Sequence, residues 1–259
     1  MLGNLCLGSL PCKQDHSEVF ETCLETPPAS LWSVSSLRRT LDFSVAALVL
    51  LIFAIPMGII AISVRLTSNG KALFSQERVG RDGRLFRIYK FRSMSEDSGA
   101  KAGAGITRGG DRRVTKFGRL MRKFKLDELP QFYNILRGDM SLVGPRPKLP
   151  QFAAIPNMPY RPGITGSASI AFRSEEEILR HVAPQQIYSF YADHIKPKKA
   201  TLDVCYMCRA TAYSDLRILA STFLTCIAPA HIPSILRPNG VPLNTRIREE
   251  PQNLSAGED

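Results

Sequence analysis

The longest apolar stretch of the chain is LDFSVAALVLLIFAIPMGIIAISVRL, residues 41–66. It carries no charged side chain from Phe43 to Val64, which is about the length that a helix needs to cross a bilayer. A buried core helix is the alternative, but this segment is apolar on every face and is flanked by arginine. The stretch therefore predicts a membrane-inserted helix over residues 37–66.

Basic residues lie on both sides of this stretch. Arg38 and Arg39 precede it, and Arg65 and Lys71 follow it. Because basic flanks tend to stay on the cytoplasmic side, we expect both ends on the same face of the membrane. Pro56 lies within the run, removes a backbone donor and bends a helix. We therefore predict a re-entrant helix, which enters, kinks and returns, rather than a spanning one.

The composition limits the classes of protein to consider. The chain has 259 residues, of which 44% are hydrophobic and 22% charged, and its net charge is +11 at pH 7. This length allows one sizeable core with tails. The charge favours a polyanionic partner: nucleic acid, an anionic membrane leaflet or a phosphorylated substrate. Composition by itself leaves these three open.

Six cysteines lie at positions 6, 12, 23, 205, 208 and 226. Cys205 and Cys208 form a CxxC pattern in an apolar helical segment, but no second pair completes a zinc site. Buried thiols in a reducing compartment are the favoured interpretation. No apolar run precedes the first basic residue, Lys13, so no secretory signal is predicted.

The rest of the chain predicts a mixed fold, mainly α-helical with short strands and poor in α/β character. A loosely ordered leader covers residues 1–36, a compact cytoplasmic core covers 67–231, and a disordered tail covers 232–259. The core elements that we expect are short β-like or irregular segments over 71–101 with a turn at RDG, a glycine-rich loop over 101–111, a charged helix over 174–181 and one or two apolar helices over 202–230. We also expect an amphipathic helix over 114–124, whose apolar face lies either on the lipid headgroups or on the core.

The stretch KLDELPQFYNILRGDMSLVGPRP, residues 125–147, places two adjacent acids, Asp127 and Glu128, at the end of the most basic part of the chain. The structural interpretation is that Asp127 caps a helix that begins near Glu128 and ends at Gly138. The functional interpretation is an anion site, because a helix N-terminus attracts anions and basic residues surround the pair in sequence. These residues are Lys90, Arg92, Arg122, Lys123, Arg146 and Arg161.

Two carboxylates and a phosphate repel one another, but a divalent cation that bridges them offsets this repulsion. Mg²⁺ is the usual cation for oxygen ligands. Neighbouring helical residues point in different directions, so the two acids would divide their roles. One would act at the reacting phosphorus, and the other would hold the metal.

Three motifs together resemble a known family. They are LDELPQFYNILRGDMSLVGPRP, FSQERVGRDGRLFRIYKFRSM at residues 74–94 and RPGITG at residues 161–166. They are similar to the bacterial sugar transferases of the polyprenyl-phosphate type, the monotopic phosphoglycosyl transferases. The likeness runs from about Arg38 to about Ser221, and its motifs are long, ordered and correctly spaced. It implies a re-entrant helix followed by a phosphoglycosyl transferase catalytic domain over residues 67–231.

The resemblance implies that the protein transfers a sugar 1-phosphate from a UDP-sugar to undecaprenyl phosphate, which initiates exopolysaccharide, capsule or glycan synthesis. Asp127 would attack the β-phosphate, UMP would leave, and undecaprenyl phosphate would then attack the phosphosugar–aspartyl intermediate. Glu128 would hold Mg²⁺. Lys90 and Arg146 would bind phosphate oxygens.

Four further residues match family positions less closely. Arg161 and Asp203 are expected at the substrate, whereas Gln76 and Arg78 either help the site or only shape the fold. After RPGITG many relatives continue with Trp and an Ala-Gln pair, but this chain reads SASIAFRSEEEIL. We expect a small form of the enzyme, without the additional N-terminal membrane helices of longer relatives.

Two rival functions are weighed against this one. A catalytically silent, membrane-anchored scaffold or binding protein of a polysaccharide assembly complex would be marked by loss of Asp127, Glu128 or Arg146, and all three are present. A nucleic-acid-binding protein would explain the charge but not the apolar stretch. We therefore expect an enzyme at the cytoplasmic face of the bacterial inner membrane, in contact with its lipids and without nucleic acid. A homodimer is left open.

Overall fold

The computed structural model describes residues 29–68, 70–95, 110–111, 113–153 and 158–227. Most of the predicted leader, most of the glycine-rich loop and the predicted tail lie outside these ranges.

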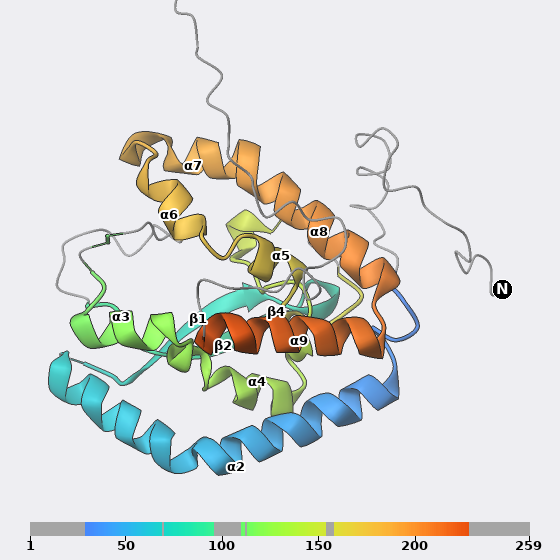
Figure 1. Ribbon diagram of the computed structural model, residues 1–259, viewed down its shortest axis with the longest axis horizontal. Coiled ribbons are helices and arrows are strands. Elements are labelled where there is room, and N and C mark those ends of the chain that lie inside the picture. Colours follow the sequence, from blue (N-terminus) through green and yellow to red (C-terminus); the bar gives the residue numbers. More distant parts are fainter. Residues whose placement is uncertain (1–28, 69, 96–109, 112, 154–157, 228–259) are drawn as a thin grey trace, which may run out of the picture.

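The apolar stretch forms one long helix, α2, Ser36–Thr67. Ser35 caps it by accepting a hydrogen bond from the backbone N–H of Arg38. The helix continues through Pro56 and bends beneath the rest of the molecule, and both of its ends rise toward the core (Figure 1). A helix thus forms where the sequence predicts one. Within the described ranges it is the one helix long and apolar enough to cross a membrane.

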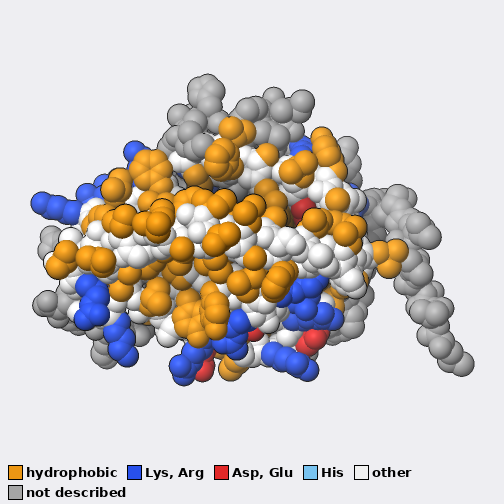
Figure 2. All heavy atoms as spheres, turned by 90° about the horizontal axis from the view of Figure 1, so that it is seen from below, with side chains coloured by type: hydrophobic (Ala, Val, Ile, Leu, Met, Phe, Trp, Pro, Cys, Tyr) orange, Lys and Arg blue, Asp and Glu red, His pale blue; other side chains and the backbone are white. Residues whose placement is uncertain are grey.

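The outer face of α2 is apolar. Figure 2 shows a broad apolar band on this side of the molecule, with Lys and Arg side chains along its edge. Exposed members of the band on α2 include Leu41, Leu48, Leu51, Ile55, Ile59, Ile62 and Leu66. Contiguous apolar surface of this kind is rare on proteins that are surrounded by water, so this face is suited to an apolar environment.

Two small sheets lie above α2. β1, Leu73–Val79, pairs antiparallel with β2, Leu85–Phe91, and a 3₁₀ turn at Arg81–Gly83 joins them, which confirms the predicted RDG turn. β3, Ser141–Val143, pairs in parallel with β4, Gly163–Thr165. The sequence did not predict β3 and β4, because strands of three residues next to Pro and Gly carry no periodic signal.

Helices make up most of the remaining described chain, as expected. They are α3, Lys116–Lys123; α4, Gln131–Arg137; α5, Ser167–Ala171; α6, Glu175–Arg180; α7, Ile187–Phe190; α8, Lys196–Arg209; and α9, Ala212–Ile227. A π-helical turn at Tyr191–Ile195 joins α7 to α8, and 3₁₀ turns lie at Leu126–Glu128, Pro150–Phe152 and Pro184–Gln186. Helix α8 begins earlier than the predicted residue 202, because a polar, lysine-rich first turn hides its start.

The central core joins elements that are far apart in sequence. Ala46 of α2, Ile88 of β2, Ile135 of α4, Val143 of β3 and Ile218 of α9 are buried in one apolar cluster. Helix α2 therefore packs on the core along its inner side while its outer side stays exposed.

The arginines before the apolar stretch anchor α2 to this core. Arg38 is buried, donates to the carbonyl oxygen of Val143 at 2.6 Å and forms an ion pair with Asp215 at 2.9 Å. Arg39 donates to the carbonyl oxygen of Ile135 at 2.7 Å, near the end of α4. The interpretation of these two residues as flanking charges at a membrane surface is therefore incomplete, because both serve the fold.

Two more side chains extend this anchor. Asp42 is buried and accepts hydrogen bonds from Ser141 Oγ at 2.6 Å and from the backbone N–H of Leu142 at 3.1 Å. Trp32 Nε1 donates to Asp215 Oδ2 at 3.0 Å. The end of the predicted leader is thus held against α9 rather than loosely ordered.

Candidate active site

The acidic pair lies in the 3₁₀ turn Leu126–Glu128 and not at the start of an α-helix. Pro130 is the N-cap of α4 and makes no side-chain capping bond. The prediction that Asp127 caps a helix beginning near Glu128 is therefore wrong. Residues 126–129 are instead held by tighter 3₁₀ bonds: the N–H of Glu128 donates to the carbonyl oxygen of Lys125 at 3.1 Å and that of Leu129 to the carbonyl oxygen of Leu126 at 3.3 Å. Gly138 ends α4 with φ +88°, as predicted.

Asp127 is buried, and one of its carboxylate oxygens, Oδ1, lacks a hydrogen-bond partner in the described structure. Burial raises the pKa of Asp127, and the neighbouring charge of Glu128 raises it further, whereas Lys90 and Lys125 oppose the shift. A buried carboxylate oxygen without a partner is costly and calls for an explanation, such as a ligand.

Glu128 is buried beside Asp127 but is surrounded by cations. It forms an ion pair with Arg146 and a second one with Lys90 Nζ at 3.4 Å. Burial alone would raise the pKa of Glu128, but Arg146, Lys90 and Lys125 outweigh this effect and lower it. Glu128 is therefore held as an anion, and its charge raises the pKa of Arg146.

Strand β2 and the loop after β3 place these two cations. Lys90 lies near the end of β2, opposite Phe74 of β1. Burial lowers the pKa of Lys90 to about 8, although Glu128 acts in the opposite direction. Arg146 follows β3 in the loop GPRP and also donates to the carbonyl oxygen of Ile164 at 3.4 Å.

The loops GPRP and RPGITG pack backbone against backbone. The N–H of Gly144 donates to the carbonyl oxygen of Thr165 at 2.8 Å, and the N–H of Gly163 donates to that of Pro145 at 2.9 Å. A Cβ atom on Gly163 would lie 2.2 Å from the backbone nitrogen of Gly144. Only glycine permits this approach, so it determines where Arg146 stands.

Gln76 and Arg78 of β1 form a support behind Arg146. Arg78 donates to Gln76 Oε1 at 2.6 Å and to the carbonyl oxygen of Pro147 at 3.3 Å. Burial and the charge of Arg146 lower the pKa of Arg78 to about 10. Both residues thus lie at the site, with Gln76 fixing Arg78.

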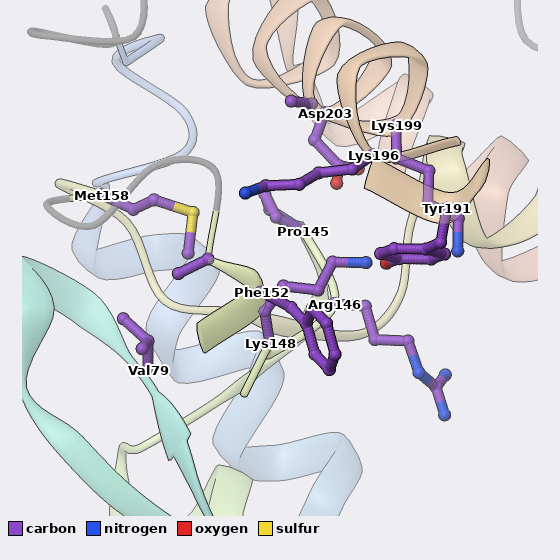
Figure 3. Close-up of a pocket in the computed structure, with 12 residues that line it drawn as sticks. Val79, Pro145, Arg146, Lys148, Phe152, Met158, Tyr191, Lys196, Lys199 and Asp203 are labelled. Carbon is purple, nitrogen blue, oxygen red and sulfur yellow. The ribbon is translucent and has the colours of Figure 1, made fainter. Parts of the chain in front are cut away.

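Asp203 lines a pocket next to the acidic pair. Arg146 belongs to both places, because it lines the pocket and forms the ion pair with Glu128. The wall of this open pocket also includes Lys148, Phe152 and Tyr191. Figure 3 shows Asp203 descending from α8 toward the segment that carries Arg146 and Lys148. Asp127 and Glu128 are not part of the wall, so the candidate site has two connected halves.

Arg161 is not brought to the acidic pair. Its Nε atom donates to the carbonyl oxygen of Gly138 at 2.7 Å, and its side chain lines a second, small polar pocket with Arg38, Arg39 and Asp42. The structure places it at the anchor of α2.

Three lysines of the site were missed in the sequence. Lys125 has φ +58°, and its charge opposes the rise in the pKa of Asp127 and helps to lower the pKa of Glu128. Lys148 and Lys199 line the pocket beside Arg146. Lys148 directly follows the GPRP motif, and this position could have indicated that it belongs to the site. Lys199 lies in a lysine-rich run that by itself indicates only a solvated surface.

A buried acidic pair inside a group of cations, beside a strongly apolar surface, is an arrangement suited to phosphorylated ligands. Comparison with known proteins gives the family. The family model described as "Bacterial sugar transferase" matches residues 33–229, so the chain belongs to the bacterial sugar transferase family.

Several curated relatives match the same part of the chain. An Aeromonas hydrophila UDP-N-acetylgalactosamine-undecaprenyl-phosphate N-acetylgalactosaminephosphotransferase is 43% identical over 143 residues, 52% of this chain and 34% of its own. A Komagataeibacter xylinus undecaprenyl-phosphate glucose phosphotransferase is 40% identical over 171 residues, 61% of this chain and 32% of its own. An Escherichia coli K12 UDP-glucose:undecaprenyl-phosphate glucose-1-phosphate transferase is 36% identical over 203 residues, which are 73% of this chain and 39% of its own. The chain thus spans about a third of the length of the first two and two-fifths of the third.

Proposed function

We propose that this protein transfers a sugar 1-phosphate from a UDP-sugar to undecaprenyl phosphate and releases UMP, as the initiating step of polysaccharide or glycan synthesis. The observation that carries the proposal is the buried Asp127 carboxylate, whose Oδ1 has no partner within the described structure, beside Glu128 and its two cations. The activities for which the relatives are named support the same reaction class.

The reaction has two steps on the same phosphorus atom. A carboxylate oxygen of Asp127 attacks the β-phosphorus of the UDP-sugar, the bond from that phosphorus to the bridging oxygen breaks, and UMP leaves with the electron pair. The product is a phosphosugar bound to Asp127. An oxygen of undecaprenyl phosphate then attacks this phosphorus, and the Asp127 carboxylate leaves unchanged.

The cations stabilise the charge that develops in these steps. Arg146 and Lys90 are balanced by Glu128 before substrate arrives, and in the complex they also face the oxygens of the reacting phosphate. The planar guanidinium of Arg146 can bind two oxygens at once.

Mg²⁺ fits this donor set. Mg²⁺ is usually held by one or two carboxylates together with substrate phosphates, and Glu128, a buried carboxylate next to the nucleophile Asp127, would supply one. The described residues contain no cluster of three or more acids, histidines or cysteines, so the remaining ligands would be phosphate oxygens and water. When bound, the metal would neutralise charge on the diphosphate.

The acceptor lipid requires access from the membrane. We propose that α2 is the re-entrant helix expected from the sequence and that the core lies at the cytoplasmic face of the inner membrane. The bend of α2 and the exposed apolar band support this arrangement (Figures 1 and 2). It would hold the acidic pair near the lipid surface.

A transfer assay tests the proposal. Full-length protein in detergent is given a panel of UDP-sugars, undecaprenyl phosphate and Mg²⁺, and UMP release and lipid-linked product are measured. We expect Asp127→Asn to lower the rate at least about 10³-fold, as loss of a covalent nucleophile does. Asp193→Asn, on an exposed residue, is the matched control and should leave the rate unchanged. Equal transfer rates for wild type and Asp127→Asn would contradict the role of Asp127, and no transfer across the panel would favour the scaffold.

A further inference from the structure

The pocket beside Arg146 holds more positive charge than the chemistry at Asp127 uses. Its wall contains four cations, Arg146, Lys148, Lys196 and Lys199, and one acid, Asp203. Figure 3 shows them approaching from two sides, with Lys196 and Lys199 on α8 and the other two cations on the segment after β3. An excess of cations around a hollow indicates an anionic ligand.

The ammonium group of Lys148 has no ion-pair partner within the described structure. Among the described residues it makes no hydrogen bond or ion pair, although the carboxylates of Asp203 and Glu175 lie close enough to act on its charge. Burial and the repulsion of Lys199 lower the pKa of Lys148 to about 8. A bound anion would relieve this unfavourable environment.

Lys199 is held in place more firmly. It forms an ion pair with Glu175, and its Nζ lies 5.5 Å from the ring centroid of Phe172 and 5.7 Å from that of Tyr191. The lysine is therefore oriented before any ligand arrives.

Asp203 is unsuited to bind a phosphate directly. It is buried at the pocket wall, and like charges repel, so a phosphate would avoid its carboxylate. Burial raises the pKa of Asp203 to about 6, while the nearby Lys148 and Lys199 lower it. Asp203 makes no direct ion pair with either lysine in the described structure, so its charge attracts the two ammonium groups from a greater distance.

One wall of the pocket is aromatic. The rings of Phe152 and Tyr191 both line it and pack edge to face, with centroids 5.7 Å apart. Aromatic faces bind planar nucleobases by stacking with little regard to sequence.

We propose that this pocket binds the nucleoside monophosphate half of the donor. Lys148 and Lys199 contact its phosphate, Asp203 positions these two lysines, and Phe152 and Tyr191 contact its base. The proposal rests on the proposed function, in which this half becomes the leaving group. As its bond to the β-phosphorus breaks, the leaving phosphate gains negative charge, and the lysines stabilise that charge.

Binding of UMP and uridine tests the phosphate contact. Full-length protein in detergent is titrated with each ligand by calorimetry. We expect Lys148→Gln to raise the dissociation constant of UMP about tenfold or more, as loss of a charge-assisted hydrogen bond does, and to leave that of uridine unchanged. Lys198→Gln, on an exposed residue of α8, should change neither. Unchanged UMP binding, or equal losses for UMP and uridine, would overturn the proposal.

Asp203→Asn tests the positioning role by the sign of its effect. If Asp203 were only a nearby acid, its neutralisation would strengthen UMP binding, because it removes a repulsive charge. If Asp203 positions the lysines, Asp203→Asn should weaken UMP binding several-fold without changing uridine binding. Tighter UMP binding would overturn this role.

The test separates this proposal from the proposed function. A wild-type protein that forms the phosphosugar adduct while Lys148→Gln binds UMP normally contradicts the pocket assignment alone. A wild-type protein that binds UMP through Lys148 but never transfers sugar phosphate contradicts the function alone.

Discussion

Asp127 and Glu128 are neighbours in the chain, yet their surroundings shift their pKa values in opposite directions. Glu128 is held as an anion by Arg146 and Lys90, whereas Asp127 keeps an oxygen without a partner. Adjacent acids can thus take different roles because one is neutralised by cations and the other is left free to react. This difference follows from tertiary contacts, which the sequence Asp-Glu does not by itself predict.

UMP affinity should depend on the protonation of Lys148. The pKa of this lysine is lowered to about 8 by burial and Lys199, against the opposing charges of Asp203 and Glu175 and with Arg146 adding repulsion. The phosphate binds the protonated amine, so affinity is full below about pH 8 and falls as the pH rises through that value. Titrations from pH 6.5 to 9.5 check this, and Lys148→Arg should flatten the decline because a guanidinium stays charged. An affinity that rises with pH would contradict the assignment.

Sequence motifs located some of the site residues and missed others for physical reasons. Asp127, Glu128 and Arg146 share one motif, and Lys90 lies in a second, so their meeting was predictable. Arg161 also lies in a motif, but its guanidinium faces the carbonyl oxygen of Gly138. A motif predicts that a residue matters and does not tell which neighbour its side chain meets.

The start of α2 is fixed to the core by a buried polar network. Arg38 donates a hydrogen bond to the carbonyl oxygen of Val143 and forms an ion pair with Asp215. Asp42 accepts a hydrogen bond from Ser141 at the start of β3. Such contacts hold the exposed helix at a defined position relative to the site. The sequence marked α2 by its apolar run, but the pairing of Arg38 with Asp215, which is far along the chain, gave no local signal.

Arg38→Ala should destabilise the fold. Removing one partner of a buried ion pair costs about 3–5 kcal/mol, because the other charge is left without compensation. At about 2–4 °C per kcal/mol, the melting temperature in detergent should fall by roughly 6 °C or more. Arg65→Ala, at the exposed other end of α2, is the control and should shift it little. Equal melting temperatures for the two variants would contradict the anchoring role of Arg38.

The molecule combines a core rich in charged side chains with a continuous apolar face. The outer side of α2 is exposed along most of its length, and Lys and Arg side chains border the apolar band (Figure 2). Composition alone indicated a polyanionic partner without saying which one. The separation of apolar and basic surfaces favours a membrane over nucleic acid.

We expect the apolar face, and not the positive charge, to determine how the protein can be extracted from membranes. We expect the protein to stay in the membrane fraction in 1 M NaCl, on the order of a tenfold excess over physiological salt, because screening weakens only electrostatic attachment. Detergent should release it. The fraction sedimenting with membranes, measured by immunoblot, checks this. Release by salt alone would indicate electrostatic attachment and would contradict an inserted α2.

The central claim is that Asp127 carries the sugar phosphate between donor and acceptor. The most direct measurement is the intact mass of wild-type protein incubated with UDP-sugars and Mg²⁺ in the absence of undecaprenyl phosphate, followed by peptide mapping. The account predicts a mass increase of one phosphosugar, located on Asp127, which is lost when undecaprenyl phosphate is added and is never formed by Asp127→Asn. Lipid-linked product that accumulates while the protein mass stays unmodified at every time point, or an adduct on another residue, would contradict it.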